Sequence, residues 1–276
     1  MSTVAIFGPG LIGGSLALAL QKVRPDWNLR LWARSQQSLE AALRVFPTVS
    51  GDETETARGA DLCVLCTPIG AMPSLAEKIA PTLSSATTVT DVGSVKAGVV
   101  RRLEKILGGR FIGSHPMAGS EQSGLGAARA NLFERAICIV TTTTISLPAS
   151  TSTVRNLWES VGCRLAEMSP EEHDERIARV SHLPHAVAAA LINAISLRVP
   201  DAGALAGGGY RDTTRIAAGP PAMWREIFLE NAAGLLAGLE DFSTTLDSMK
   251  KMILSQDAAA LELFLERAKA IRQDLP

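Results

Sequence analysis

A glycine-rich turn near the start of the chain constrains its fold more than any other feature of the sequence. Residues 8–13 read Gly-Pro-Gly-Leu-Ile-Gly, a G-x-G-x-x-G pattern, and they directly follow an apolar run at residues 4–7. The residues from 11 to 21 are rich in Leu and Ala and predict a helix. A strand, a glycine-rich turn and a helix in this order are typical of the first unit of a dinucleotide-binding fold.

The three glycines of this turn have separate predicted roles. Gly8 makes the tight turn, Gly10 lets a pyrophosphate approach the backbone, and Gly13 allows the helix to pack closely on the strand. The backbone amides at the helix start, including those of Leu11 and Ile12, lie at the positive end of the helix dipole and would bind the phosphates. A glycine-rich turn without a ligand is the alternative.

The first part of the chain alternates between short apolar runs and helical patterns. We expect strands at residues 4–7, 29–32, 62–66, 87–91, 110–112, 136–141 and 164–168. Crossover helices are expected at residues 11–21 and 36–46, and a further helix is expected at residues 154–161. This alternation predicts an α/β domain over residues 1–168, with a doubly wound, mostly parallel sheet of the Rossmann type.

The character of the sequence changes at Ser169, which can cap a helix that begins with Pro170 and has Glu172 at the capping-box position. Helical patterns follow at residues 171–179, 185–197, 221–242 and 258–274. We therefore expect an all-helical second domain over residues 169–276. Because such a domain has little hydrophobic core of its own, we expect it to pair with a second copy in a homodimer.

The composition excludes several classes of function. The 27 Lys and Arg residues nearly balance the 28 Asp and Glu residues, and the net charge of -1 provides no basic surface for nucleic acid or for an anionic membrane. No apolar run approaches the length of a membrane span, and the amino terminus lacks a basic and apolar leader, so we expect a cytoplasmic protein.

The cysteines, at positions 63, 66, 138 and 163, are too few for a disulfide framework in a chain of this length. Cys63 and Cys66 form a C-x-x-C pattern, but they lie inside an apolar run that is typical of a buried strand. We therefore expect neither a redox centre nor a metal site there.

The residues at the end of the second strand bear on the choice of dinucleotide. Enzymes that use NAD normally carry an acidic residue there, which binds the 2'-hydroxyl of the adenosine ribose. This chain has Ala33, Arg34 and Ser35 instead. A guanidinium and a hydroxyl can bind a 2'-phosphate, so we expect NADP, with NAD as the second choice and a solvated Arg34 as the alternative. Thr67 and Pro68, which end the next strand, are expected to line the same crevice.

Polar clusters follow the strands at residues 87–91 and 110–112, at the edge where an open α/β sheet binds its ligands. The first cluster contains Ser94, and the second contains His115 and Glu121. A neutral imidazole can draw the proton from a substrate hydroxyl while hydride leaves the same carbon, so His115 is the candidate base, in a loop beyond its strand. The alternatives are a structural role for His115 and a solvent-facing Glu121.

The helical half supplies further polar candidates. Arg211 and Arg215 are four residues apart and would share a face of a helix if that segment is helical, where they could bind a carboxylate; pairing with Asp212 or another acid is the alternative. His182 and His185 flank a proline without a matching cysteine or carboxylate pattern, so we expect no metal there, and a buried structural role is the alternative for either histidine.

Five ordered motifs give the chain a resemblance to a known family. They are Gly-Pro-Gly-Leu-Ile-Gly (8–13), Asp-Val-Gly-Ser-Val-Lys (91–96), Gly-Ser-His-Pro-Met-Ala-Gly-Ser-Glu (113–121), Ser-His-Leu-Pro-His (181–185) and Gly-Gly-Gly-Tyr-Arg-Asp-Thr-Thr-Arg (207–215). Over nearly its whole length the chain resembles the prephenate and arogenate dehydrogenases of tyrosine biosynthesis. The resemblance implies a nucleotide-binding domain, a helical dimerisation domain, and oxidative decarboxylation of a cyclohexadienyl acid.

The resemblance also implies roles for individual residues. His115 would accept a hydrogen bond from the ring hydroxyl as hydride passes to the nicotinamide, and Ser94 would position the hydroxyl and the cofactor. Arg215 would bind a substrate carboxylate, with His185 and Glu121 lining the site. Because relatives that prefer arogenate often lack a counterpart of His185 or Glu121, the resemblance favours prephenate, with an arogenate or dual-specificity cyclohexadienyl dehydrogenase as the alternative.

Three further residues, Asp174, Asp212 and Trp224, match family positions near the entrance of the site. The nearest enzymatic rivals are β-hydroxyacid dehydrogenases and ketopantoate-type reductases, which share the glycine fingerprint but not the Ser-His-Pro-Met-Ala-Gly or Ser-His-Leu-Pro-His segment. From a different class, a non-catalytic NADP-binding dimeric sensor would bind the cofactor without turnover.

Overall fold

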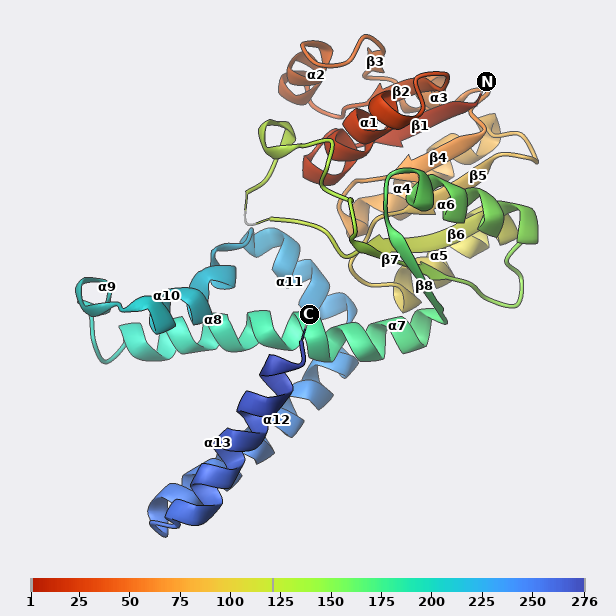
Figure 1. Cartoon of the computed structure of the whole chain (residues 1–276). Coiled ribbons are helices and arrows are strands. Elements are labelled where there is room, and N and C mark those ends of the chain that lie inside the picture. The colour runs from red at the N-terminus through yellow and green to blue at the C-terminus, as the bar shows by residue number, and fades with distance from the viewer. Residues whose placement is uncertain (1, 121, 276) are drawn as a thin grey trace. The chain divides into compact units, whose positions relative to one another are not determined.

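The computed structural model describes residues 2–120 and 122–275 (Figure 1). By its internal packing the chain divides into two units, Met1–Asn231 and Ala232–Pro276. The first unit contains a sheet, the helices that flank it, and the helices up to α11. The second unit contains α12 and α13.

The sheet belongs to the first unit, and in the described residues it has eight strands in the order β3-β2-β1-β4-β5-β6-β7-β8. The strands are β1 (Thr3–Phe7), β2 (Asn28–Trp32), β3 (Val49–Ser50), β4 (Leu62–Leu65), β5 (Thr88–Asp91), β6 (Phe111–Pro116), β7 (Ile137–Thr141) and β8 (Arg164–Met168). These neighbours are parallel except for β6 and β7, which are antiparallel. The strand order reverses at β1, so the sheet is doubly wound and mostly parallel, as predicted.

Alternating side chains of the central strands form an apolar core on each face of the sheet. Val4 and Ile6 of β1 pack on one face, and Ala5 and Phe7 pack on the other. The helices of the first face are α1 (Leu11–Val23), α2 (Gln36–Leu43) and α6 (Pro148–Ser160), and those of the second are α3 (Glu53–Ala57), α4 (Met72–Ile79) and α5 (Ala97–Leu107). Apolar residues on both sides of each strand therefore require helices on both faces.

The helices after β8 begin with a long, uninterrupted rod. It consists of α7 (Pro170–Ile177), a π-helix (Ala178–His182) and α8 (Leu183–Ser196), and it is followed by α9 (Ala202–Leu205), α10 (Gly208–Thr214), the 3-10 helix η6 (Arg215–Ala218) and α11 (Pro221–Glu230). The side chain of Ser169 accepts a hydrogen bond from the amide of Glu172 at 3.1 Å, which is the predicted cap of α7. π-helical turns inside longer helices occur often at functional sites.

Several predicted elements differ from the structure. The strand predicted at residues 110–112 continues to Pro116, because its second half pairs with β7, so the loop predicted for His115 is wrong. The helix predicted at residues 221–242 is two helices, because Asn231 leaves the helical conformation with φ −116° and ψ 39°. β3 was not predicted because two residues are too few to show an alternating pattern.

The second unit is a pair of helices, α12 (Ala232–Leu254) and α13 (Ala258–Gln273), which contact each other. Large apolar side chains are exposed on both helices: Leu236, Ile253, Leu254, Leu263, Leu265 and Ile271. Exposed apolar surface of this extent is typical of a surface that contacts another protein. In the described part of the chain, no helix is both long enough and apolar enough to cross a membrane.

Candidate active site

The glycine-rich turn has a geometry that only glycines permit. Gly8 has a φ of +105°, and a Cβ there would lie 2.8 Å from the carbonyl oxygen of Cys66. A Cβ on Gly13 would overlap the carbonyl oxygen of Gly8, so only glycine lets α1 pack this closely on the turn. A Cβ on Gly10 would meet no described atom within 4 Å. The backbone at Gly10 therefore faces open space, where a phosphate group can approach.

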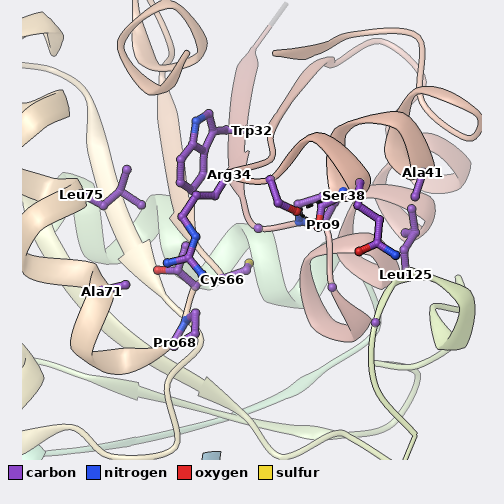
Figure 2. Close-up of a pocket in the computed structure, with 16 residues that line it drawn as sticks. Pro9, Trp32, Arg34, Ser38, Ala41, Cys66, Pro68, Ala71, Leu75 and Leu125 are labelled. Carbon is purple, nitrogen blue, oxygen red and sulfur yellow. Dashed lines mark hydrogen bonds between the residues drawn. The ribbon is translucent and has the colours of Figure 1, made fainter. Parts of the chain in front are cut away.

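A pocket of about 440 Å³ opens beside this turn (Figure 2). The residues predicted to bind the cofactor that line it are Gly8, Gly10, Arg34, Ser35, Thr67 and Pro68. Three others, Leu11, Ile12 and Gly13, lie in the first turn of α1 behind the lining. Sequence reasoning missed Gln37 and Leu125. The helix start after Ser35 could have indicated Gln37, whereas Leu125 comes from a distant loop that gave no signal.

Among the described residues that line the pocket, Arg34 is a cation and none has a carboxylate. Arg34 lies with Trp32 on one side of the pocket in Figure 2, and Ala33, at the position of the usual acidic residue, is buried. The side chain of Ser35 caps α2 by accepting a hydrogen bond from the next turn of the helix. The hydroxyl of Thr67 is buried and has no hydrogen-bond partner within the described residues. An arginine, a helix start and an unsatisfied hydroxyl fit a ligand that carries phosphate groups.

Four parallel strands bring the other candidates to the same edge of the sheet. β1, β4, β5 and β6 are neighbours in that order and run in the same direction. The segments at their carboxyl ends carry, in turn, Gly8, Thr67, Ser94 and His115. Ligands of open α/β sheets bind beyond this edge. The predicted cofactor-binding and catalytic residues of the sheet therefore lie along one edge.

A buried ion pair fixes the loop that carries Ser94. Asp91 and Lys96 are both 0% exposed, and the Lys96 ammonium contacts Asp91 Oδ2. Asp91 Oδ2 also accepts a hydrogen bond from the amide of Gly93 at 2.8 Å, while Oδ1 accepts one from the amide of Ser114 at 3.1 Å. The carboxylate of Asp91 therefore holds the loop after β5 against β6, next to His115. Sequence reasoning placed Asp91 and Lys96 in a motif but gave neither a role.

His115 lies on β6, and its side chain is buried with 6% of its surface exposed. Burial, together with the nearby His173, Lys96 and His182, holds its pKa well below 6.5. The ring is therefore neutral at neutral pH. His115 Nδ1 lies 2.9 Å from His173 Nε2, and the two nitrogens share a hydrogen bond. This leaves Nε2 as the nitrogen of His115 that makes no hydrogen bond within the described residues.

Asp174, on α7, is a buried carboxylate that joins His173 to the start of α5. It is 7% exposed, and its Oδ1 lies 2.8 Å from His173 Nδ1. Oδ1 and Oδ2 accept hydrogen bonds from the amides of Lys96 and Ala97, at 2.7 and 2.9 Å, at the start of α5. Burial acts to raise the pKa of Asp174, but these hydrogen bonds outweigh it and lower that pKa. The carboxylate is therefore ionised and caps α5.

Two histidines of the rod have buried nitrogens without a partner among the described residues. His182, on the π-helix, is 0% exposed. Its Nδ1 lies 3.3 Å from the side-chain nitrogen Nδ2 of Asn231, and its Nε2 has no hydrogen-bond partner among the described residues. Burial lowers the pKa of His182 to about 4, against the opposing effects of Asp174 and the backbone of Ser94. His185 Nδ1 is also unsatisfied. Buried polar atoms of this kind can be satisfied by a bound ligand.

The segment that carries Arg215 packs beside His185. Arg215 is exposed and begins η6, which contacts α8. A Cβ on Gly219, just after η6, would lie 2.5 Å from Trp224 Nε1 and 3.2 Å from His185 Cε1. Trp224 in turn stacks on His185 with a ring-centroid distance of 3.5 Å.

Two further predictions concern Arg211 and Glu121. The segment that carries Arg211 and Arg215 is helical, but its type changes between them: α10 ends at Thr214, and Arg215 directly begins the 3-10 helix η6. Glu121, predicted to line the site, lies outside the described residues.

The C-x-x-C pair has the environment of a buried strand. Cys63 is 0% exposed on β4, and Cys66 follows directly at the edge of the dinucleotide pocket. Burial raises the pKa of the Cys63 thiol to about 12 and raises that of Cys66 as well. Both thiols are therefore protonated at neutral pH, which is the unreactive form.

Comparison with known proteins gives the family. Residues 16–167 match the nucleotide-binding domain of prephenate dehydrogenase, and residues 169–267 match its dimerization domain. The chain is 37% identical to the cyclohexadienyl dehydrogenase of Zymomonas mobilis over 97% of this chain and 94% of that protein. It is 34% identical to the prephenate dehydrogenase of Bacillus subtilis over 99% of this chain and 76% of that protein.

A solved structure agrees with these matches. The prephenate dehydrogenase from A. aeolicus, in complex with hydroxyphenyl propionate and NAD+, superimposes with a TM-score of 0.95 at 35% identity, covering 100% of this chain and 99% of that one. Together with the glycine-rich turn and its pocket, these matches mean that the first part of the chain binds NAD(P). The chain belongs to the prephenate dehydrogenase family and is an NAD(P)-dependent dehydrogenase.

Proposed function

We propose that the chain catalyses the NADP-linked oxidative decarboxylation of prephenate to 4-hydroxyphenylpyruvate, in tyrosine biosynthesis. The observation that carries the proposal is a buried, neutral His115 on the same sheet edge as the dinucleotide pocket, with Nε2 available to a ligand. An enzyme that removes hydride from a carbon bearing a hydroxyl needs such a base to take the hydroxyl proton.

The residues of this chain have separate roles in the proposed reaction. A bound nicotinamide dinucleotide supplies the hydride acceptor. His115 Nε2 accepts the proton of the ring hydroxyl, and Ser94, on the loop held by Asp91, positions that hydroxyl. Loss of CO2 makes the ring aromatic, and this large driving force leaves the protein mainly the tasks of alignment and proton removal.

The proposed substrate contacts come from the helical part. Arg215 would bind a carboxylate of prephenate, and His185, with its unsatisfied Nδ1, would line the site. Glu121 is proposed at the same site on the basis of sequence. The unsatisfied Nε2 of His182 adds a buried donor that a polar substrate could satisfy. The presence of both His185 and Glu121 favours prephenate over arogenate, which is the alternative substrate.

For the cofactor, we propose NADP in preference to NAD. The pocket has Arg34 and Ser35 beside a buried Ala33, and no carboxylate on its described wall that would repel a 2'-phosphate. NAD remains the competing choice, because the A. aeolicus relative was solved with NAD+.

We further propose that the protein is a homodimer with a nucleotide-binding domain at residues 1–168 and a substrate and dimerisation domain at residues 169–276. The exposed apolar side chains of α12 and α13 support the dimer, because they need a partner surface. The match of residues 169–267 to a dimerization domain supports it as well.

A steady-state assay of reduced nicotinamide formation tests the proposal, with prephenate and arogenate each combined with NADP and NAD. We expect the highest kcat/KM with prephenate and NADP. A higher kcat/KM with arogenate would mean that arogenate, the alternative, is the substrate. Cofactor binding without turnover of either acid would favour the non-catalytic sensor and contradict the proposed function.

A further inference from the structure

A chain of buried hydrogen bonds leads away from His115 into the protein. His115 Nδ1 lies 2.9 Å from His173 Nε2, and His173 Nδ1 lies 2.8 Å from Asp174 Oδ1. His173 is 0% exposed, and both it and Asp174 belong to α7. We propose that His173 and Asp174 are positioning residues that fix the tautomer of His115 and take over its positive charge during turnover. The proposal deepens the proposed dehydrogenation and rests on it.

The direction of each hydrogen bond follows from Asp174. Its two oxygens accept hydrogen bonds from the amides of Lys96 and Ala97, which can only donate, so the carboxylate acts as an acceptor. His173 Nδ1 must then donate to Asp174. A neutral His173 has its lone pair on Nε2, and that atom accepts from His115 Nδ1. A neutral His115 therefore has its lone pair on Nε2, where a base needs it.

The charges around this chain of hydrogen bonds keep both rings neutral before turnover. Burial lowers the pKa of His173 in spite of its hydrogen bond to Asp174. The Lys96 ammonium lowers the pKa of His173 and His115 alike, while the carboxylate of Asp91 raises that of His173. His182, from the π-helix, adds to the lowering at His115. Both histidines are therefore neutral near pH 7.

The arrangement permits a proton to be passed on. When His115 Nε2 takes the hydroxyl proton of the substrate, the proton on His115 Nδ1 moves across the 2.9 Å hydrogen bond to His173 Nε2. One proton has entered and none has left, so the charge balance is kept. The positive charge then rests on His173, in contact with the Asp174 carboxylate. Burying a cation beside a carboxylate costs far less free energy than burying an unpaired cation. This transfer of a proton from His115 to His173, the proton relay, therefore stabilises the state that follows proton removal.

The alternative is a purely structural role. Asp174 caps α5, and its carbonyl oxygen accepts a hydrogen bond from the side chain of Asn231 at 2.7 Å. A structural role predicts that substitutions lower the melting temperature and the activity together, without changing how activity depends on pH. The relay predicts a specific tautomer and a changed pH profile.

The tautomer can be measured without any turnover. The chain has four histidines, so two-bond 1H–15N spectra of protein labelled with 15N-histidine contain four ring systems, which single His→Gln variants assign. We expect His115 and His173 protonated on Nδ1, and His182 protonated on Nε2 because Asn231 donates to its Nδ1. A His115 ring protonated on Nε2 in the wild-type protein would overturn the proposal, whatever the substrate is.

Kinetics of His173 variants test the charge transfer. His173→Gln keeps an acceptor for His115 Nδ1 but cannot take a proton, and His173→Phe does neither. We expect kcat to fall at least about tenfold in His173→Gln and further in His173→Phe, with KM for prephenate and NADP within about threefold of wild type. The acid limb of the kcat profile should move to lower pH, because the first proton taken up by the His115–His173 pair no longer rests on a ring beside the Asp174 carboxylate.

Ser169→Ala provides the matched control, because it removes the cap of the same helix without touching the relay. It should lower the melting temperature and leave the pH profile unchanged. Wild-type kcat in His173→Phe, or a loss of kcat with an unmoved acid limb, would overturn the relay. If the wild-type protein oxidises neither prephenate nor arogenate, the proposed function fails, and the tautomer spectra still decide whether His173 and Asp174 fix the tautomer of His115.

Discussion

The carboxylate of Glu226 accepts a hydrogen bond from the backbone amide of Gly70 at 2.6 Å, although 156 positions separate the two residues. Its other oxygen accepts one from the amide of Ile69 at 3.2 Å. These amides begin the 3-10 helix η1 (Ile69–Ala71), which directly follows Thr67 and Pro68 in the wall of the dinucleotide pocket. A side chain of α11 therefore fixes one wall of the cofactor site.

Loss of this contact should weaken cofactor binding. Glu226→Gln places an amide group against the backbone N–H of Ile69 or Gly70, and we expect the Kd for NADP to rise by about three- to tenfold. Gly70→Ala should act in the same direction, because its Cβ would lie 2.6 Å from Glu226 Oε1. Isothermal titration calorimetry measures both. Glu175→Gln, which removes an exposed carboxylate on α7, serves as the control. Unchanged affinity in both variants would contradict the assigned role.

Arg34 is expected to select the dinucleotide. Arg34→Ala removes a charge-assisted hydrogen bond to the 2'-phosphate, so KM for NADP should rise by about ten- to a hundredfold while KM for NAD changes little. Arg44→Ala, an exposed arginine at the other end of α2 and away from the pocket, should change neither constant. Equal effects of Arg34→Ala on the two cofactors would refute the 2'-phosphate assignment.

His115 is expected to be needed for turnover but not for folding or cofactor binding. In His115→Asn, kcat should fall by about 10²- to 10⁴-fold, the usual range for loss of a general base. The Kd for NADP should stay at its wild-type value, because His115 does not line the dinucleotide pocket. Steady-state rates and calorimetry on the same preparation check both points. A wild-type rate would remove His115 from the mechanism.

Acid should destabilise the folded protein through its buried histidines. Burial lowers the pKa of His115, His173 and His182 below 6.5, to about 4 for His182. Below pH 6.5 the unfolded chain therefore binds protons that the folded chain does not, so the free energy of unfolding falls as the pH falls from 6.5 toward about 4. Each such histidine contributes a slope of up to about 1.4 kcal/mol per pH unit.

Urea unfolding at a series of pH values measures this slope. His182→Gln should reduce it, because one of the buried histidines is gone, even if the variant is less stable at neutral pH. The substitution of His185 should also reduce the slope, because burial lowers the pKa of His185 as well. A free energy of unfolding that does not change between about pH 7 and pH 5 would contradict the assignment of neutral buried histidines.

The glycine-rich turn shows what could be predicted from sequence. The constraints on Gly8 and Gly13 arise from atoms of the same turn and of the neighbouring strand end, so a short motif contains nearly all of the information. The same holds for Ser169, whose hydrogen-bond partner lies three residues away. The geometry of such motifs can be predicted because most of the residues that determine it are close together in the sequence.

The hydrogen bonds behind His115 could not be predicted in this way. His173 lies 58 positions from His115, and Asp174 lies 78 positions from Lys96, so these contacts depend on how α7 packs against β6 and α5. The role of Asp174 as a cap of α5 could not be predicted, because nothing local in the sequence distinguishes a carboxylate that caps a neighbouring helix from one that faces solvent. The end of β6 was misplaced for a similar reason, since pairing with β7 extends the strand.

In the proposed enzyme, His115, Ser94 and Arg215 surround one substrate cavity that faces the bound dinucleotide. A crystal structure with NADP and hydroxyphenyl propionate, the compound bound in the A. aeolicus relative, tests it most directly. We predict the phenolic oxygen of the ligand about 3 Å from His115 Nε2 and its carboxylate on the guanidinium of Arg215. A guanidinium tens of ångströms from the ligand, in every protomer and across every subunit contact, would contradict the account.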